Sequence, residues 1–262
     1  MSIYKEMISL IKIFLDPGHG GDSIGASYKG RREQDDCLRL ALAVRDILFT
    51  QKGVEVMLSR EDDTDPDLLK RAERANGWGA DYFLSIHRNA FTPEGATGVE
   101  AWVYSGVQTG GTTYTMAQSI VNDLSAVTGY RNRGVKKGAP AYRDYAVNRY
   151  TKMHSCLLEV GFIDNTKDNA VFDTMFSDMA LSIAKALLNN AGLGYVPPVI
   201  KGDADGDGKI TAEDARLILR ASVGLRKIEE ERADLDGDGK ITAGDAREAL
   251  KRAVGGDSQY GK

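Results

Sequence analysis

The sequence predicts an α/β domain, in which helices flank a twisted and largely parallel β-sheet, followed by a small all-α domain. Two observations lead to this expectation. Up to about residue 193, short apolar runs alternate with amphipathic stretches, a pattern typical of strands and helices around a parallel sheet. From residue 203 onward the sequence repeats itself, which indicates a small module built from two similar units.

Short runs in the first domain have the length and the apolar character of buried strands. They lie at residues 12–15, 54–58, 82–86, 99–104 and 155–160. The stretches between them have the apolar spacing of amphipathic helices, at residues 35–51, 67–77, 114–128 and 174–191. Because strands and helices alternate, we expect the helices to flank the sheet.

A stretch rich in glycine and proline separates the two domains. It contains Pro197 and Pro198, which stiffen a linker. We therefore expect a first domain at residues 1–193, a linker at 194–201, a second domain at 202–256 and a tail at 257–262. Within the second domain, residues 203–224 match residues 234–255 at about two-thirds of their positions.

Composition and charge exclude several classes of protein. The chain is 42% hydrophobic and 27% charged, with a formal net charge of −4, so no basic half suggests a nucleic-acid or anionic-membrane partner. No apolar run reaches the roughly 18 residues of a membrane helix. Lys5, Glu6 and Lys12 interrupt the apolar N-terminal residues, so we expect a protein made in the cytoplasm without an evident signal peptide. Cys37 and Cys156 fall in separate elements and are expected to be buried free thiols.

Four polar residues lie at positions in the sequence that a parallel sheet would bring together at one edge. His19 and His87 each follow a β-type run, and Glu159 lies inside an apolar run, where an unpaired carboxylate is costly. Glu33 opens a predicted helix directly after a glycine-rich loop. Because ligands collect at the carboxyl ends of the strands in such sheets, we expect these side chains to converge.

Two histidines and a glutamate match the ligands of a catalytic zinc ion, which keeps one position open for water. A further carboxylate nearby can accept the proton of that water. Each residue also has another explanation. A histidine after a strand is often packed or exposed, glycines such as Gly18 can simply form a turn, and Glu33 can favour a helix N-terminus electrostatically. Spacing alone leaves these alternatives open.

A set of segments in a fixed order favours the zinc interpretation. They are IFLDPGHGG (13–21), Glu33 ahead of a helix, LSREDDTD (58–65), LLKRAERAN (68–76), ADYFLSIHRNA (80–90), GVEAWVY (98–104) and LLEVGFIDN (157–165). In these segments residues 12–193 resemble the zinc-dependent N-acetylmuramoyl-L-alanine amidases of the amidase-3 type. The resemblance implies that His19, Glu33 and His87 bind zinc and that Glu159 is the catalytic glutamate. It also implies hydrolysis of the amide between the lactyl group of muramic acid and L-alanine of the stem peptide.

Three residues in or near these segments, Arg88, His154 and Asn89, have no role in the assignments above. Arg88 stands where the family usually has a small or neutral residue, and His154 lies where proline is common. We assign His154 no metal role. Asn89 is expected either to bind substrate or to fix its loop, and the sequence does not decide between the two.

Two acidic loops in the second domain have the spacing of calcium ligands. Carboxylates occupy loop positions 1, 3, 5 and 12, and glycine at position 6 permits the sharp turn. The loops offer Asp203, Asp205, Asp207 and Asp214, and Asp234, Asp236, Asp238 and Asp245. Lys209 and Lys240, at position 7, would contribute backbone carbonyls. Two acidic surface turns are the alternative, but without a cation the carboxylates of each loop would repel one another.

The second domain resembles a type I dockerin over residues 202–255, because position 12 is Asp rather than Glu and no helix precedes the first loop. The helices expected after the loops, at residues 214–223 and 245–254, would pack together through Leu217, Ile218, Leu219, Ala249 and Leu250. A dockerin implies a cohesin partner. Binding to the wall, self-association and packing against the amidase domain stay open.

Together these observations predict a peptidoglycan hydrolase with one catalytic Zn²⁺ and two structural Ca²⁺ ions. The zinc would polarise the scissile carbonyl and lower the pKa of a bound water, and Glu159 would move the proton. The absence of an evident signal favours a phage or prophage endolysin that acts on the cell wall after release. A bacterial autolysin, a zinc peptidase acting on the stem peptide and a cohesin-anchored wall-binding protein are the alternatives.

Overall fold

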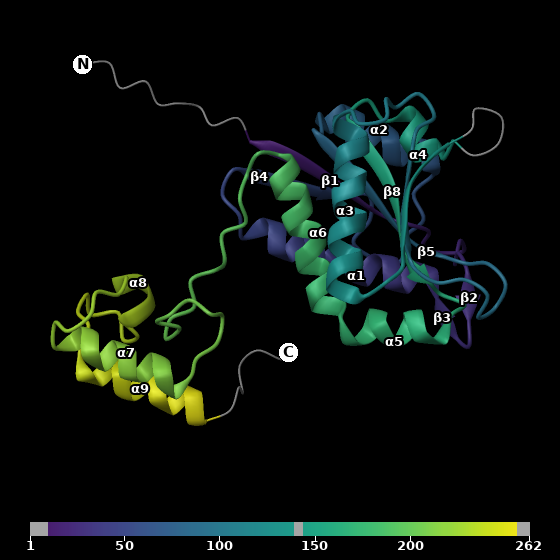
Figure 1. The fold of residues 1–262 in the computed structure, drawn as a ribbon. Coiled ribbons are helices and arrows are strands. Elements are labelled where there is room, and N and C mark those ends of the chain that lie inside the picture. Colours follow the sequence, from purple (N-terminus) through teal and green to yellow (C-terminus); the bar gives the residue numbers. More distant parts are fainter. Residues whose placement is uncertain (1–9, 139–143, 256–262) are drawn as a thin grey trace, which may run out of the picture. The chain divides into compact units, whose positions relative to one another are not determined.

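A computed structural model of the chain describes residues 10–138 and 144–255. The protein divides into two compact units between Tyr195 and Val196, a point inside the expected linker (Figure 1). All described strands belong to the first unit, whereas the described part of the second contains only helices and loops. The fold class predicted from the sequence is therefore confirmed.

The first unit is built on a six-stranded sheet in the order β4-β1-β5-β8-β6-β7. Its strands are β1 (Ile11–Pro17), β4 (Val54–Leu58), β5 (Tyr82–Asn89), β6 (Val99–Val103), β7 (Asn132–Lys137) and β8 (His154–Phe162). Strands β4, β1, β5 and β8 run parallel to one another, whereas β6 runs antiparallel to β8 and parallel to β7. The sheet is thus largely parallel. A separate short hairpin pairs β2 (Ser27–Tyr28) with β3 (Arg31–Arg32).

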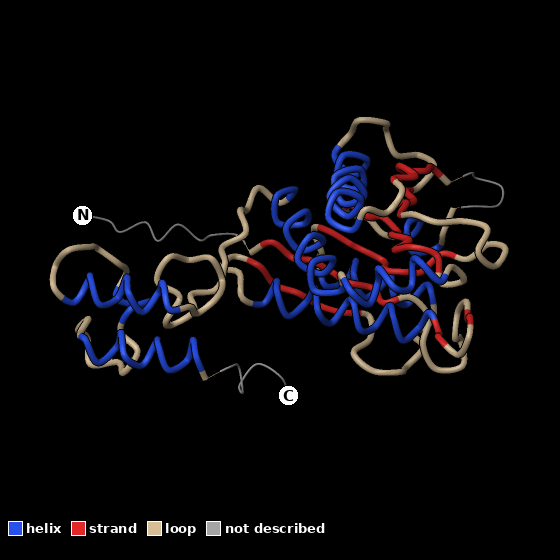
Figure 2. The backbone as a smooth tube through the Cα atoms, turned by 60° about the horizontal axis from the view of Figure 1, so that its bottom comes forward, coloured by secondary structure: helices blue, strands red, loops and turns tan. Residues whose placement is uncertain are grey.

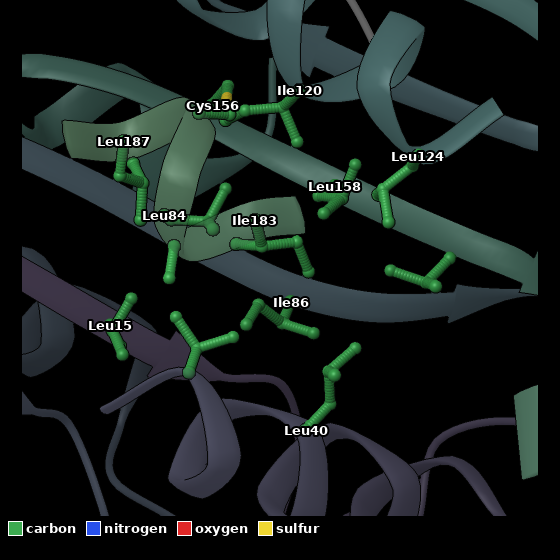
Figure 3. Packing of buried hydrophobic residues seen from close by; sticks show 14 of the residues in the cluster. Leu15, Leu40, Leu84, Ile86, Ile120, Leu124, Cys156, Leu158, Ile183 and Leu187 are labelled. Atoms are coloured by element: carbon green, nitrogen blue, oxygen red, sulfur yellow. The ribbon is translucent and has the colours of Figure 1, made fainter. Parts of the chain in front are cut away.

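Three long helices pack on one face of the sheet and bury the main core. They are α1 (Glu33–Phe49), α3 (Thr112–Thr128) and α6 (Phe176–Asn190). Figure 2 shows the strands in red and these helices in blue. Figure 3 shows how their side chains meet those of the strands, with Leu40, Ile120 and Ile183 near Leu84, Ile86 and Leu158. Burying a side chain of this size stabilises the fold by about 1.5–3 kcal/mol.

The opposite face carries a smaller apolar cluster and the polar strand residues. Helices α2 (Leu68–Trp78) and α4 (Ala146–Tyr150) pack there around Phe14, Phe83 and Leu157. Side chains alternate between the two faces of a strand. Because Ile86 and Leu158 belong to the main core, His87 and Glu159 face the same side as α2 and α4. Helix α5 (Thr166–Thr174) follows β8 and leads into α6.

Cys37 of α1 and Cys156 of β8 are buried and unpaired, as expected. Burial in the apolar core raises the pKa of Cys156 to about 12. Both thiols therefore pack as small hydrophobic groups. Among the described helices of the whole chain, none combines the length and apolar character needed to cross a membrane.

The described part of the second unit contains the helices α7 (Ala212–Ser222), α8 (Glu230–Ala233) and α9 (Ala243–Val254). The two long helices begin in the same way, because Thr211 and Thr242 each form a reciprocal capping box with the Asp three residues later. Leu217, Ile218 and Ala249 lie in the core between them, as expected. The expectation for Leu219 and Leu250 was wrong: they are 47% and 43% exposed, because both lie outside the buried stripe of their helix.

Candidate active site

His19 lies in the loop after β1 and adopts a left-handed backbone conformation, with a φ of 60°. That conformation is costly for a residue other than glycine, so the surroundings must hold it. Arg71 of α2 does so: its Nη2 donates to the His19 carbonyl at 2.9 Å and its Nη1 to the Pro17 carbonyl at 2.7 Å. Ser23 Oγ lies 3.3 Å from His19 Nδ1. The ring is thereby oriented with Nε2 toward Glu33.

Glu33 is the first residue of α1, and its carboxylate lies between the two histidines. Oε1 is 3.2 Å from His19 Nε2 and 2.9 Å from His87 Nδ1. The backbone N–H of Ala26 donates to Oε2 at 2.8 Å, and that of Arg88 donates to Oε1 at 3.1 Å. Burial opposes the ionised form of Glu33, but the hydrogen bonds and charges of the two histidines hold its pKa well below the usual range of a carboxyl group.

His87 lies inside β5 rather than after it, because pairing with β8 continues beyond the run expected from the sequence. Its imidazole packs directly on the backbone of the loop that carries His19. A Cβ added to Gly18 would lie only 2.3 Å from His87 Cε1, far closer than a normal contact. Glycine at this position therefore makes room for the imidazole.

His19, Glu33 and His87 fit a zinc ion by their chemistry and their spacing. Two imidazole nitrogens and a carboxylate oxygen form a common ligand set of catalytic zinc. Their ligand atoms lie within 4.8 Å of one another. Ligands held at about 2.0–2.1 Å from a tetrahedral zinc lie about 3.3 Å apart, close to the distances measured from Glu33 Oε1. The structure thus brings together the three residues that the sequence suggested.

Glu159 lies beside this cluster on β8, at the position that pairs with His87. Its side chain is buried, and Oε2 has no hydrogen-bond partner among the described residues. Burial raises the pKa of Glu159 well above its usual value, and the nearby charges of Glu33 and Glu100 act in the same direction. An unpartnered buried carboxylate oxygen is costly to keep, so its presence here favours a functional role.

A second buried carboxylate on this face, that of Glu100 on β6, was not anticipated. Its Oε1 accepts hydrogen bonds from Asn89 Nδ2 at 3.1 Å and Trp102 Nε1 at 2.9 Å, and its Oε2 accepts one from Arg133 Nε at 2.6 Å. The sequence did contain a signal for it. Like Glu159, Glu100 is a carboxylate within an apolar run, and such a residue needs partners.

Asn89, whose role the sequence left open, and His154, which was assigned no metal role, both make internal contacts. Asn89 donates to Glu100 and accepts a hydrogen bond from the backbone N–H of Ala90 through Oδ1 at 2.9 Å, which favours its loop-fixing alternative. His154 lies at the start of β8, at the opposite end of the strand from Glu159, with Nδ1 2.9 Å from Thr113 Oγ1. His154 is therefore not part of the cluster.

Arg88 is buried on the face opposite the cluster. Nη1 forms an ion pair with Asp36 of α1, and Nη2 donates to Asn169 Oδ1 of α5 at 2.7 Å. The guanidinium also lies 4.2 Å from the centre of the Phe172 ring. Arg88 therefore links β5, the strand that carries His87, to the start of α1, which carries Glu33.

The acidic loops of the second unit each gather three carboxylates. The ligand atoms within each group lie within 4.8 Å of one another, in the groups Asp203, Asp205 and Asp214, and Asp234, Asp236 and Asp245. The first and the last aspartate of each loop are buried. Buried carboxylates this close together fit a hard divalent cation such as calcium.

The remaining two predicted carboxylates and both lysines lie at the turn of each loop. Asp207 Oδ1 accepts a hydrogen bond from the Lys209 N–H, and Asp238 Oδ1 accepts one from the Lys240 N–H, both at 2.8 Å. These bonds fix the two turns in the same conformation. Asp207 and Asp238 are not part of the three-carboxylate groups.

Comparison with known proteins finds a family match for each of the two units. Residues 13–189 match the N-acetylmuramoyl-L-alanine amidase family, and residues 201–254 match the type I dockerin domain. A relative from Bacillus licheniformis, the N-acetylmuramoyl-L-alanine amidase CwlM, is 43% identical over 61% of this chain and 59% of its own length. The endolysin of Bacillus phage SPP1 is 34% identical over 67% of this chain and 64% of its own. The chain thus spans about three-fifths of the length of these curated relatives.

Solved structures show the same fold for the first unit. The N-acetylmuramoyl-L-alanine amidase from Clostridium difficile 630 superposes with a TM-score of 0.65 and 30% identity, covering 70% of this chain and 98% of the other. The catalytic domain of CwlV from Bacillus (Paenibacillus) polymyxa gives a TM-score of 0.63, also at 30% identity, and covers 70% of this chain and 99% of the other. Through residues 13–189 the chain belongs to the N-acetylmuramoyl-L-alanine amidase family, and at residues 201–254 it carries a type I dockerin domain.

Proposed function

We propose that this protein hydrolyses the amide bond between N-acetylmuramic acid and L-alanine in peptidoglycan. One observation carries the proposal. The Glu33 carboxylate lies between His19 and His87, and the buried Glu159 carboxylate, with an unpartnered oxygen, occupies the neighbouring strand position. Family membership and the relatives named above support the choice of bond.

His19, Glu33 and His87 would hold the zinc ion through Nε2, the carboxylate and Nδ1. When bound, zinc supplies a Lewis acid for the scissile carbonyl and lowers the pKa of water. The chain prepares the ligands in advance. Ser23 orients the His19 ring, and the backbone N–H groups of Ala26 and Arg88 fix the carboxylate of Glu33.

Glu159 would perform the proton transfers of the reaction. Its carboxylate takes a proton from the attacking water and delivers it to the leaving nitrogen of L-alanine. The position suits this task because Glu159 faces the same side of the sheet as His87 and its Oε2 is not engaged by another described residue. Glu100, by contrast, is saturated by its partners and is not proposed as the base.

The test is an analysis of digested peptidoglycan by mass spectrometry and N-terminal labelling. We expect free L-alanine N-termini to accumulate while the glycan strands stay intact. Cleavage between two amino acids would instead identify a stem-peptide peptidase, and new reducing sugar ends would identify a glycosidase. The Glu159→Gln variant, prepared in the same way, controls for contaminating hydrolases.

In the second unit, we propose that two calcium ions bind the acidic loops and that the folded module binds a cohesin. The three-carboxylate groups and the match to the type I dockerin domain support this proposal. Size-exclusion chromatography of the full chain with a recombinant type I cohesin, with and without calcium, tests it. Self-association would appear in the same experiment as a larger species that forms without the cohesin.

For the biological role, we propose an endolysin that acts on the wall after release from the cytoplasm. Similarity to the phage SPP1 endolysin supports this, whereas 39% identity to a sporulation-specific amidase of Bacillus subtilis favours a bacterial wall amidase. Immunodetection in fractions of intact host cells separates the two. An endolysin is expected in the cytoplasm until lysis, and a wall amidase in the wall of intact cells.

A further inference from the structure

A cavity of about 750 Å³ lies next to the candidate active site, on the same face of the sheet. It is lined by residues of β5, β6, β7 and β8 and of the loops beyond them. These include Asn89, Phe91, Glu100, Trp102, Arg133 and Phe162. Glu100 connects the cavity to the site, because it pairs with Glu159 across strands β6 and β8.

Among the described residues that line this cavity, Arg133 is the cation, and its contacts fix its orientation. Its Nε donates to Glu100 Oε2 at 2.6 Å, and its guanidinium lies 4.9 Å from the centre of the Phe162 ring. The Arg133 side chain is 27% exposed, whereas that of Glu100 is 4% exposed. No hydrogen bond of the two Arg133 Nη groups is found to any residue that the structure describes. The outer edge of the guanidinium is therefore available to a ligand.

A guanidinium with two free, parallel N–H groups is suited to a carboxylate, which it binds through two hydrogen bonds at once. Glu100 is shared by Arg133 and by Lys136, whose Nζ is 3.7 Å away, so Glu100 does not fully neutralise the charge of Arg133. Asp144, which also lines the cavity, accepts hydrogen bonds from the N–H and the hydroxyl of Ser105.

We propose that Arg133 binds a carboxylate group of the stem peptide while the amide bond lies at Glu159. This inference rests on the proposed function and adds a determinant of substrate choice. The distances allow it. Neighbouring strands lie about 4.8 Å apart, so Glu100 is one strand from Glu159, and Arg133 reaches Glu100 directly. An extended chain advances about 3.5 Å per residue, which places the second or third stem residue within reach of the cavity.

Two carboxylates of the stem can supply this chemistry. The second residue carries a free α-carboxylate when it is isoglutamate and a neutral carboxamide when it is isoglutamine. The third residue carries an extra carboxylate when it is diaminopimelate and none when it is lysine. The glycan side of the scissile bond offers hydroxyl and acetamido groups, which do not use the charge of a guanidinium. The cavity is therefore assigned to the peptide side.

The experiment uses the full chain loaded with zinc and four soluble muropeptides. They combine isoglutamate or isoglutamine at the second position with diaminopimelate or lysine at the third. We expect the unmodified protein to prefer a substrate with the recognised carboxylate. Arg133→Gln should lower kcat/KM for that substrate by about tenfold to a hundredfold, mainly through KM, because hydrogen bonds to charged groups contribute on this scale. The substrate without that carboxylate should be cleaved as before.

The position whose carboxylate governs the loss identifies the group that is bound. A loss that is equal for all four substrates, or no loss, would overturn the inference while leaving the amidase activity in place. If the unmodified protein exposes no L-alanine N-terminus from any of them, the proposed function itself fails, and this inference with it.

Two further variants control for folding and for charge. Lys136→Gln removes a neighbouring positive charge that is not among the residues lining the cavity, and it should keep the preference. Arg133→Lys keeps the charge but not the paired N–H groups, so it should retain the fold and lose the preference in part. Unchanged zinc content and thermal midpoint of Arg133→Gln would show that the loss is not structural.

Discussion

Glu100 of β6 and Glu159 of β8 occupy paired positions on neighbouring antiparallel strands, and both carboxylates are buried on the same face of the sheet. Their surroundings differ sharply. Glu100 accepts hydrogen bonds from three side chains, whereas Glu159 Oε2 has no partner in the described part of the chain. Two like charges this close destabilise each other's ionised forms. The protein therefore holds the Glu100 carboxylate in place through hydrogen bonds, whereas the Glu159 carboxylate is available for proton transfer.

Replacing Glu159 with Gln should leave the fold and the zinc content intact and reduce turnover by about a hundredfold or more, the usual contribution of a general acid–base residue. Gln has nearly the same shape, and no described partner of Oε2 is lost. Rates of wall lysis and of L-alanine N-terminus release measure the effect. Glu55→Gln, on the edge strand β4, is the control and should behave as the unmodified protein. Near-normal lysis by Glu159→Gln would show that the base lies elsewhere.

Replacing His19 or His87 with Ala should abolish both activity and zinc retention, because two ligands rarely hold zinc in an open site. Elemental analysis after dialysis measures the bound metal. His154→Ala serves as the matched control, since His154 lies at the other end of β8 and contacts Thr113. Zinc retained in full by both the His19 and the His87 variants would refute the ligand assignment.

Gly18→Ala should weaken zinc binding although it changes no ligand. The added Cβ would lie 2.3 Å from His87 Cε1, so either the imidazole or the loop that carries His19 must shift, which disturbs the spacing of the ligands. We expect lower zinc content and activity with the fold preserved. Gly77→Ala is the contrasting variant, because its Cβ would meet nothing within 4 Å and alanine favours helix α2 by about 0.5–1 kcal/mol. If Gly18→Ala kept full zinc occupancy, the close packing inferred for His87 would be wrong.

Removing calcium should unfold the second unit and leave the first one folded. Each loop brings three carboxylates together, and the core between α7 and α9 is small, so binding of the ion is expected to be coupled to folding. Calorimetry of the full chain should show one transition that a calcium-selective chelator abolishes and one that it does not. Asp214→Asn should weaken the calcium-dependent transition, whereas the exposed neighbour Glu213→Gln should not. A chelator without effect on either transition would contradict the calcium role.

The strands and helices with strong apolar patterns could be predicted from the sequence. Strand β4 was expected at the residues it occupies, and α1 begins at Glu33, within two residues of the expected start. Strand β7, Asn132–Lys137, was not expected, because an edge strand that is mostly polar is specified by its ladder with β6 rather than by burial. Helix α5 is likewise polar and is set by its Asn165 cap and its contact with β8.

A residue of the candidate site could be predicted where burial of its polar side chain without a partner would be unfavourable. Glu159 interrupts an apolar run, and this cost pointed to a special role. The partners that hold such residues were not predictable. Arg133 comes from the unexpected strand β7, and Arg71 meets the loop of His19 only through the packing of α2. These contacts depend on the order of strands in the sheet, which local patterns do not encode.

Strand β8 is the last of the described strands in the sequence, yet it lies between β5 and β6 in the sheet. The two groups β4-β1-β5 and β6-β7 are joined only through β8, so during synthesis they cannot form one sheet until residues 154–162 have left the ribosome. The same insertion delivers Glu159, so hydrolytic capacity would arise in one late step. A chain that stops before this strand has two unpaired edges of the kind that pair with other chains. Prematurely terminated copies are thus expected to aggregate rather than to damage the wall.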